Sequence, residues 1–172
     1  MAGLGLGTSL LQCLTLYVIM GMNGALETLV SQAYGADQLK LCGVYLNRAR
    51  IINTVIFVPL VIILCLVSPL LGALGKSPEI IEYTQTYIAV NLPGVFFLGL
   101  FDLERRFLNC VKNSWVPMIF QAFVTFLHLY WCHIFVAQLE MELVGIGIAT
   151  SITSFTLFGA TVIYARFGVP EI

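Results

Sequence analysis

The chain has 172 residues, of which 59 % are hydrophobic and only 10 % are charged, and its formal net charge is −1. Soluble chains are about 45–50 % apolar and about 25 % charged, so this composition excludes a soluble enzyme and a disordered segment. The near-zero net charge gives no electrostatic basis for binding nucleic acid. The five cysteines are scattered and form no CxxC pair, which indicates neither a disulfide framework nor a metal site.

Five mostly apolar segments follow one another along the chain, each near the length of about 20 residues that a helix needs to cross the hydrocarbon core. Runs such as 55–66 are apolar on every face, which favours helices over the alternating strands of a β-barrel. We therefore expect an all-α, polytopic transmembrane bundle. Its expected helices cover about residues 8–30, 51–74, 83–101, 115–137 and 143–165.

The segments between these helices hold most of the charge, and the basic residues gather on one side. If the chain crosses five times, that side receives Lys40, Arg48, Arg50, Arg105, Arg106, Lys112 and Arg166. The other side receives Lys76, Glu79, Glu82, Glu140 and Glu142. By the positive-inside rule the basic side is cytoplasmic, so the N-terminus of this chain is expected outside and its C-terminus in the cytoplasm. An outside start without a signal peptide predicts that an upstream helix is missing.

The first expected helix carries a polar stripe. Asn23, Glu27 and Ser31 are spaced four residues apart and share one face, and Gln32 adjoins them. Polar groups in hydrocarbon are costly, so Asn23, Glu27 and Gln32 are candidates for an ion or solute path. In a functional role Glu27 takes up and releases a proton; in a structural role its carboxylate fixes helix packing.

The second and third helices contain Pro59 and Pro93, and each proline removes a backbone hydrogen bond and is expected to kink its helix. Such a kink lies beside a cavity or a moving joint, or it serves packing alone. Asn91 precedes the second kink by two residues, and its amide lines a polar path or satisfies the kinked backbone.

Two further groups of polar residues follow. At the inner end of the third helix, Asp102 and Arg106 are spaced four apart, which predicts a surface ion pair, and Arg105 is expected to extend to the lipid headgroups. In the middle of the fourth helix, His128 is a candidate proton carrier, since histidine changes charge nearest to neutral pH. The alternative is a hydrogen bond from His128 to a neighbouring helix.

Small residues gather in two helices and favour close helix packing. They are Gly21, Gly24 and Ala25 in the first, and Gly145, Gly147 and Ala149 in the fifth.

The sequence holds no P-loop, GxSxG, HExxH or dinucleotide-binding motif, so we expect neither an enzyme nor a cofactor.

The order of the motifs resembles the multidrug and toxic compound extrusion (MATE) family of the eukaryotic type. Residues 21–29 read GMNGALETL and residues 31–36 read SQAYGA, which is similar to a stretch of the family's second helix. Residues 74–80 (LGKSPEI), 93–94 (PG), 106–109 (RFLN) and 145–152 (GIGIATSI) resemble later family motifs in the same order. Cys132 and Val111 stand where the family often has asparagine and glutamine.

The resemblance implies that residues 1–172 form a single transmembrane lobe corresponding to helices two to six of twelve. It implies a secondary antiporter that exports organic or xenobiotic solutes in exchange for protons or sodium ions. Glu27 matches the family's second-helix acid. The expected partners are the lipid bilayer, a small organic solute, and the missing first helix and C-terminal lobe. The expected location is the plasma membrane or a vacuole-type membrane.

Two other interpretations remain open at this point. The chain is a non-transporting membrane scaffold or a truncated regulatory relative, or it is a half-transporter that dimerises around an axis along the membrane normal.

Overall fold

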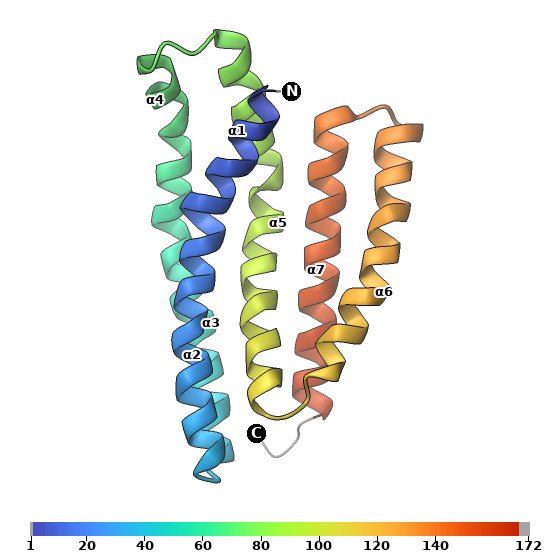
Figure 1. Ribbon diagram of the computed structural model, residues 1–172. Helices are drawn as coiled ribbons and strands as arrows, with labels where there is room; N and C mark the ends of the chain where they lie inside the picture. The colour runs from blue at the N-terminus through green and yellow to red at the C-terminus, as the bar shows by residue number, and fades with distance from the viewer. Residues whose placement is uncertain (1, 169–172) are drawn as a thin grey trace.

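The computed structural model describes residues 2–168, which form helices joined by short turns (Figure 1). In chain order the elements are α1 (Ala2–Leu11), a π-helical segment η1 (Gln12–Leu16), α2 (Tyr17–Gly35), α3 (Leu39–Cys65), α4 (Val67–Ala73), α5 (Pro78–Cys110), α6 (Trp115–Cys132), a second π-helical segment η2 (His133–Gln138) and α7 (Glu142–Gly168).

Five helical spans among these residues are long and apolar enough to cross a membrane, which confirms the expected bundle. They cover Gly5–Gly35, Leu39–Ala73, Pro78–Cys110, Trp115–Gln138 and Leu143–Gly168. The chain is an integral, multi-pass membrane protein.

The spans extend beyond the apolar segments that predicted them. α3 begins at Leu39 and α5 continues to Cys110, so both include charged residues that the sequence analysis placed in connections. Hydrophobic length marks only the part of a helix that lies in hydrocarbon, whereas backbone hydrogen bonding continues into the interface. The charged residues at the ends of α3 and α5 are therefore positioned by regular helix and not by flexible loops.

The helices continue through both internal prolines, Pro59 in α3 and Pro93 in α5. The second span is instead interrupted at Leu66, where α3 ends and α4 begins. Pro69 explains the position of this break, because a proline ring clashes with the carbonyl four residues earlier, which here belongs to Cys65.

α5 is the central helix of the bundle. It lies between the pair α2 and α3 and the pair α6 and α7 (Figure 1). Half of the residues in its apolar window are buried inside the molecule, compared with 6 % in the span that contains α6. α5 is therefore enclosed by protein on much of its surface, while α6 presents most of its surface outward.

Glycine permits the close approach of α5 and α7. A Cβ atom added at Gly94 of α5 would lie 3.2 Å from the backbone of Ser151, and one added at Gly147 of α7 would lie 2.5 Å from Val90. At Gly21 and Gly24 an added Cβ would meet no atom of the described residues within 4 Å. Among residues 2–168, close packing thus holds for Gly145 and Gly147 of the last helix and not for Gly21 and Gly24 of the first.

Candidate functional site

The polar stripe of α2 faces α5. Asn23 is 1 % exposed, and its amide nitrogen donates to the Gly99 carbonyl and to Asp102 Oδ2, both at 3.1 Å. Its amide oxygen accepts a hydrogen bond of 2.7 Å from the Asn53 amide of α3. One side chain therefore connects three membrane-spanning helices.

Glu27 lies one turn further along the same stripe and binds α5 through an arginine. Arg106 Nη1 donates to Glu27 Oε2 at 2.6 Å, and Arg106 Nε donates to Asp102 Oδ2 at 2.9 Å. The Glu27 side chain is 48 % exposed, whereas that of Asp102 is 1 % exposed. The expected ion pair between Asp102 and Arg106 is confirmed, but its expected surface position is wrong for Asp102, because α2 packs over this carboxylate and supplies it with the Asn23 amide.

Arg105 also binds Asp102 and does not simply extend to the headgroups. Its Nη2 donates to Asp102 Oδ1 at 2.5 Å, so both carboxylate oxygens of Asp102 accept charge-assisted hydrogen bonds. We call Asn23, Glu27, Asn53, Asp102, Arg105 and Arg106 the α2–α3–α5 network. The sequence analysis identified Glu27 and Asn23 as site candidates and missed Asn53, which lies in an otherwise apolar run.

A second carboxylate on α5 is buried next to this network. Glu104 has no exposed side-chain surface, and its Oε1 accepts a 2.6 Å bond from Arg50 Nε of α3. Its other oxygen, Oε2, is buried and has no hydrogen-bond partner among the described residues. The sequence analysis also missed Glu104, because it interpreted residues 102–114 as a connection. Extending the helical periodicity past Phe101 could have identified Glu104 as a residue on the helix.

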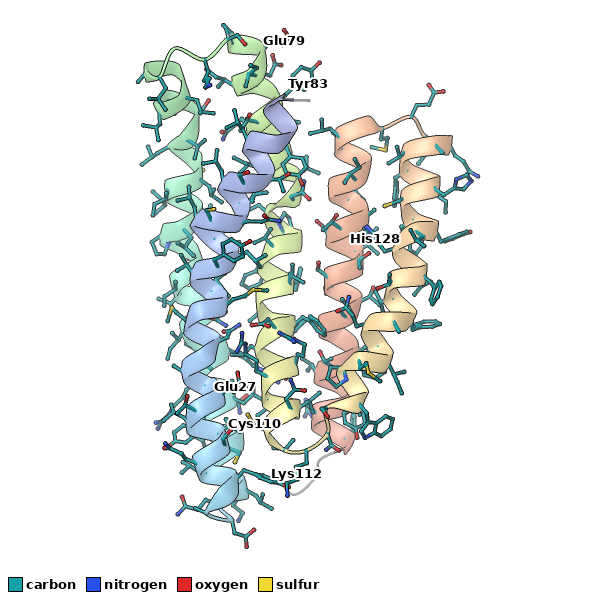
Figure 2. All side chains as sticks on the ribbon, in the orientation of Figure 1. Glu27, Glu79, Tyr83, Cys110, Lys112 and His128 are labelled. Carbon is teal, nitrogen blue, oxygen red and sulfur yellow. The ribbon has the colours of Figure 1, made fainter. Side chains whose placement is uncertain are left out.

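A thiol, Cys110, binds the end of the polar stripe that is expected to lie toward the cytoplasm. Ser31 Oγ donates to Cys110 Sγ at 3.3 Å, and Cys110 in turn donates to the Glu27 carbonyl. Figure 2 shows Glu27 and Cys110 in the same part of the bundle. Gln32 is exposed near the end of α2 and does not join the α2–α3–α5 network.

Asn91 and His128 lie away from this network. The Asn91 amide donates to the Tyr87 carbonyl of its own helix at 2.9 Å. His128 Nδ1 lies 2.9 Å from Thr153 Oγ1 of α7, and Nε2 lies 3.4 Å from Cys132 Sγ. Because the Thr153 hydroxyl already donates to the Ala149 carbonyl, it accepts from Nδ1–H of the imidazole, so this hydrogen bond ties α6 to α7.

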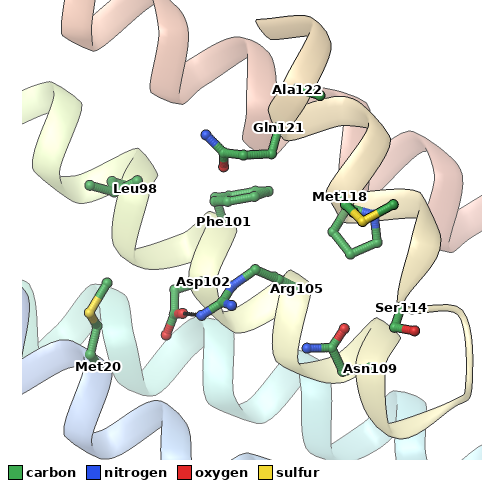
Figure 3. A pocket seen from close by; sticks show the side chains of 11 residues that line it. Met20, Leu98, Phe101, Asp102, Arg105, Asn109, Ser114, Met118, Gln121 and Ala122 are labelled. Carbon is green, nitrogen blue, oxygen red and sulfur yellow. Dashed lines mark hydrogen bonds and ion pairs between the residues drawn. The ribbon is translucent and has the colours of Figure 1, made fainter. Parts of the chain in front are cut away.

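A cavity of about 650 Å³ opens beside the network, between α2, α5 and α6 (Figure 3). We call it the α5–α6 cavity. Its lining residues are Met20, Leu98, Phe101, Asp102, Arg105, Asn109, Ser114, Pro117, Met118, Gln121 and Ala122. Asn23 and Asn53 line a second cavity of about 250 Å³ between α2 and α3. Asn23 and Asp102, the buried members of the network, are hydrogen-bonded to each other and line one cavity each.

The comparison with protein families decides the identity of the chain. Residues 1–134 match the family model MatE. The chain belongs to the MatE family. This membership confirms the resemblance that the motifs of α2 and α5 indicated.

The curated relatives of this chain are about three to four times as long as the region that it matches. The chain is 29 % identical over 149 residues to Protein DETOXIFICATION 16 of Arabidopsis thaliana, covering 87 % of this chain and 31 % of that protein. It is 26 % identical over 167 residues to Multidrug and toxin extrusion protein 1 of Danio rerio, covering 97 % of this chain and 28 % of that protein.

A solved structure has the same fold. The crystal structure of the eukaryotic MATE transporter AtDTX14 superimposes with a TM-score of 0.92 at 19 % identity, covering 99 % of this chain and 38 % of that chain. The chain thus spans about a third of the length of the curated relatives it matches.

Proposed function

We propose that this chain is part of a secondary active antiporter that exports organic or xenobiotic solutes in exchange for protons or sodium ions. The observation that carries the proposal is the α2–α3–α5 network, which holds four charged side chains inside a membrane-spanning bundle and beside a cavity of about 650 Å³. Charged side chains within membrane-spanning segments are costly and mark ion and solute paths. The proposal assigns transport and not catalysis to this site.

Glu27 is the entry point for the coupling ion in this proposal. It is the most exposed carboxylate of the network and is bound to Arg106, which also holds Asp102. A proton or sodium ion on Glu27 competes with Arg106 for the carboxylate. Release of Arg106 loosens the connection between α2 and α5. Ion binding would change the shape of the cavity through this loss of contact.

The proposal includes a second lobe and a further helix beyond those described, since two-lobe transporters alternate access between lobes related by an axis along the membrane normal. It places the basic end of the bundle in the cytoplasm and the protein in the plasma membrane or a vacuole-type membrane.

The test is flux from the native protein that carries this sequence, reconstituted in liposomes loaded with a fluorescent organic dye. We expect an imposed proton or sodium gradient to drive dye movement, and Glu27→Gln to reduce this flux at least tenfold. Glu82→Gln is the matched control, because Glu82 is an exposed carboxylate at the opposite end of α5. Dye flux that does not depend on either gradient, or that is the same in the Glu27→Gln variant, contradicts the proposal.

The same preparation separates the alternatives. Gradient-driven flux from a purified 172-residue product that runs as a dimer would favour the half-transporter. Stable insertion of that product without flux would favour the scaffold or regulatory interpretation.

A further inference from the structure

The first membrane-spanning helix changes its hydrogen-bond pattern part-way along. The Tyr17 N–H donates to the carbonyl of Gln12, five residues earlier, which makes η1 a π-helical turn between α1 and α2. The helix is continuous through this turn, since Leu11 and Tyr17 both have α-helical dihedral angles. The chain changes direction here, and α1 leans across α5 (Figure 1). A π-helical turn inside an α-helix is rare and is frequently found at functional positions.

Thr15 lies in η1 and lacks a hydrogen bond that threonine forms elsewhere in the bundle. Its hydroxyl is buried and has no hydrogen-bond partner among the described residues. Eight threonines in the α-helices donate to the carbonyl four residues earlier, namely Thr28, Thr54, Thr84, Thr125, Thr150, Thr153, Thr156 and Thr161. The same bond from Thr15 would go to Leu11, and the wider π-helical turn accounts for its absence. Because this chain's own residues enclose Thr15, a further helix packed outside them cannot supply a partner.

The unpaired hydroxyl gives residues 12–16 a reason to adopt a second conformation. A buried polar group without a partner is costly, and more so where lipid excludes water. If these residues become α-helical, the Thr15 hydroxyl can donate to the Leu11 carbonyl. The register of α1 then changes by one residue, which turns α1 by about 100° and moves it by about 1.5 Å along its axis.

The contact of α1 with α5 opposes this change. A Cβ atom added at Gly7 would lie 2.8 Å from the Tyr87 ring, so only glycine permits this approach. The Gly3 carbonyl accepts from the Thr84 hydroxyl at 3.1 Å. A turn of about 100° removes both glycines from α5. Thr84 would keep a partner, since its hydroxyl also lies 2.7 Å from the Ile80 carbonyl of its own helix.

On the other side of η1, α2 is held in place. Asn23 is hydrogen-bonded to α3 and α5, and Glu27 is paired with Arg106 of α5. The register also differs between the two sides. Gly3 is bonded to a residue 81 positions later, whereas Asn23 is bonded to Asp102, 79 positions later. Between these two contacts the first span therefore uses two residues more than α5, and the π-helical turn takes up part of this excess.

We propose that η1 is a two-state hinge, which changes between a π-helical and an α-helical turn and so rotates α1 on α5 while the α2–α3–α5 network holds α2 in place. Each state has a contact that the other lacks, which is the condition for a bistable element. The π-helical state keeps the glycine contact with α5, and the α-helical state gives Thr15 its hydrogen bond. As a step of the transport cycle, this inference rests on the proposed function.

Distances between spin labels test the hinge. They are measured in nanodiscs on the native protein that carries this sequence, with its cysteines replaced by serine. One pair joins Gly5→Cys of α1 to Glu140→Cys, and the control pair joins Gly21→Cys of α2 to the same position. Both glycines accept a side chain, since an added Cβ meets nothing within 4 Å among the described residues. We expect two distance populations for the Gly5 pair and one for the Gly21 pair.

Two substitutions should shift the Gly5 populations in opposite directions. Thr15→Val keeps the side-chain shape and removes the unpaired hydroxyl, so the π-helical population should rise about fivefold or more relative to the other. Gly7→Ala places a Cβ against Tyr87 and should lower this ratio about fivefold or more. Thr125→Val and Gly159→Ala make the same changes at positions away from η1 and should leave the ratio within about twofold.

Deletion of position 13, an exposed cysteine of η1, identifies the populations. With one residue fewer, an α-helical turn keeps α1 in its present orientation on α5, so only the population raised by Thr15→Val should remain. Two populations that persist in the deletion variant overturn the proposal.

Other outcomes also overturn the proposal. They are a single distance in the parent and in both substituted proteins, two populations whose ratio neither substitution changes, and an equal response of the Gly21 pair, which would mean that the whole span moves. The labels are measured without a gradient. Two populations with absent flux therefore contradict only the proposed antiport, and gradient-driven flux with one population contradicts only this inference.

Discussion

At the scale of single residues, Asn23 shows why an amide occupies this position. It donates to the Asp102 carboxylate and to the Gly99 carbonyl, and it accepts from the Asn53 amide. Leucine could do neither, and an ionised aspartate could only accept. The spacing of Asn23, Glu27 and Ser31 predicts their common face from the sequence alone. Their partners on α5 could not be predicted, because no local pattern states which helix will cover that face.

The first prediction concerns replacement of Asn23. Hydrogen bonds between membrane helices contribute about 0.6 kcal/mol each on average, so loss of the three Asn23 bonds in Asn23→Leu should lower the free energy of unfolding by about 2 kcal/mol. Asn23→Asp should lower it further at neutral pH, because it places a second carboxylate next to Asp102. The measurement is SDS-induced unfolding in mixed micelles.

Acidification separates the two substitutions. A protonated carboxyl at position 23 donates a hydrogen bond again, so Asn23→Asp should regain stability at low pH and Asn23→Leu should not. Thr125→Val is the control, since within residues 2–168 the exposed Thr125 hydroxyl binds a carbonyl of its own helix and no other helix. Equal unfolding of all three variants would show that the network adds nothing to stability.

At the scale of elements, the contact of α5 with α7 depends on glycine. Gly94 faces the backbone of Ser151, and a backbone cannot rotate away as a flexible side chain does. The sequence predicted close packing from the glycines of the last helix, and Gly147 confirms it. The same composition in the first helix gave the wrong expectation within residues 2–168, because composition marks where a helix permits close approach and not which neighbour arrives. The length of the apolar segments also did not predict where the helices end, because residues 102–110 of α5 are helical although several of them are charged.

The second prediction tests this contact. Gly94→Ala should lower the free energy of unfolding by about 1–3 kcal/mol, the usual cost of overpacking. Gly159→Ala on α7 is the matched control, because an added Cβ there meets nothing within 4 Å among the described residues. That control should be neutral or gain up to about 1 kcal/mol from helix propensity. The readout is the SDS unfolding midpoint, and a Gly94→Ala variant as stable as Gly159→Ala would contradict the packing argument.

At the scale of the whole molecule, charge is distributed along the bundle axis. The end that carries the 36–38 and 111–114 turns holds the seven basic residues named above, and the opposite end carries the 74–77 and 139–141 turns (Figure 1). Three of the seven, Arg50, Arg105 and Arg106, are paired with carboxylates on α2 or α5. Within residues 2–168 the basic residues without a carboxylate partner are Lys40, Arg48, Lys112 and Arg166 at this end and Lys76 at the other end. We expect these unpaired charges to orient the bundle. Sequence counting predicted the division between ends, but only the structure shows which charges are compensated.

The last prediction is the orientation itself. In a background where all five cysteines are replaced by serine, Ser114→Cys should react with a membrane-impermeant maleimide only after the membrane is permeabilised, whereas Glu140→Cys should react in intact cells. The reason is that lysine and arginine near helix ends are retained in the cytoplasm. Replacing Lys40, Arg48 and Lys112 by glutamine should make the labelling of both sites mixed, while replacing the paired Arg105 by glutamine should leave it unchanged. Mixed labelling caused by Arg105→Gln would mean that its charge acts before it pairs with Asp102, during insertion and not in the folded bundle.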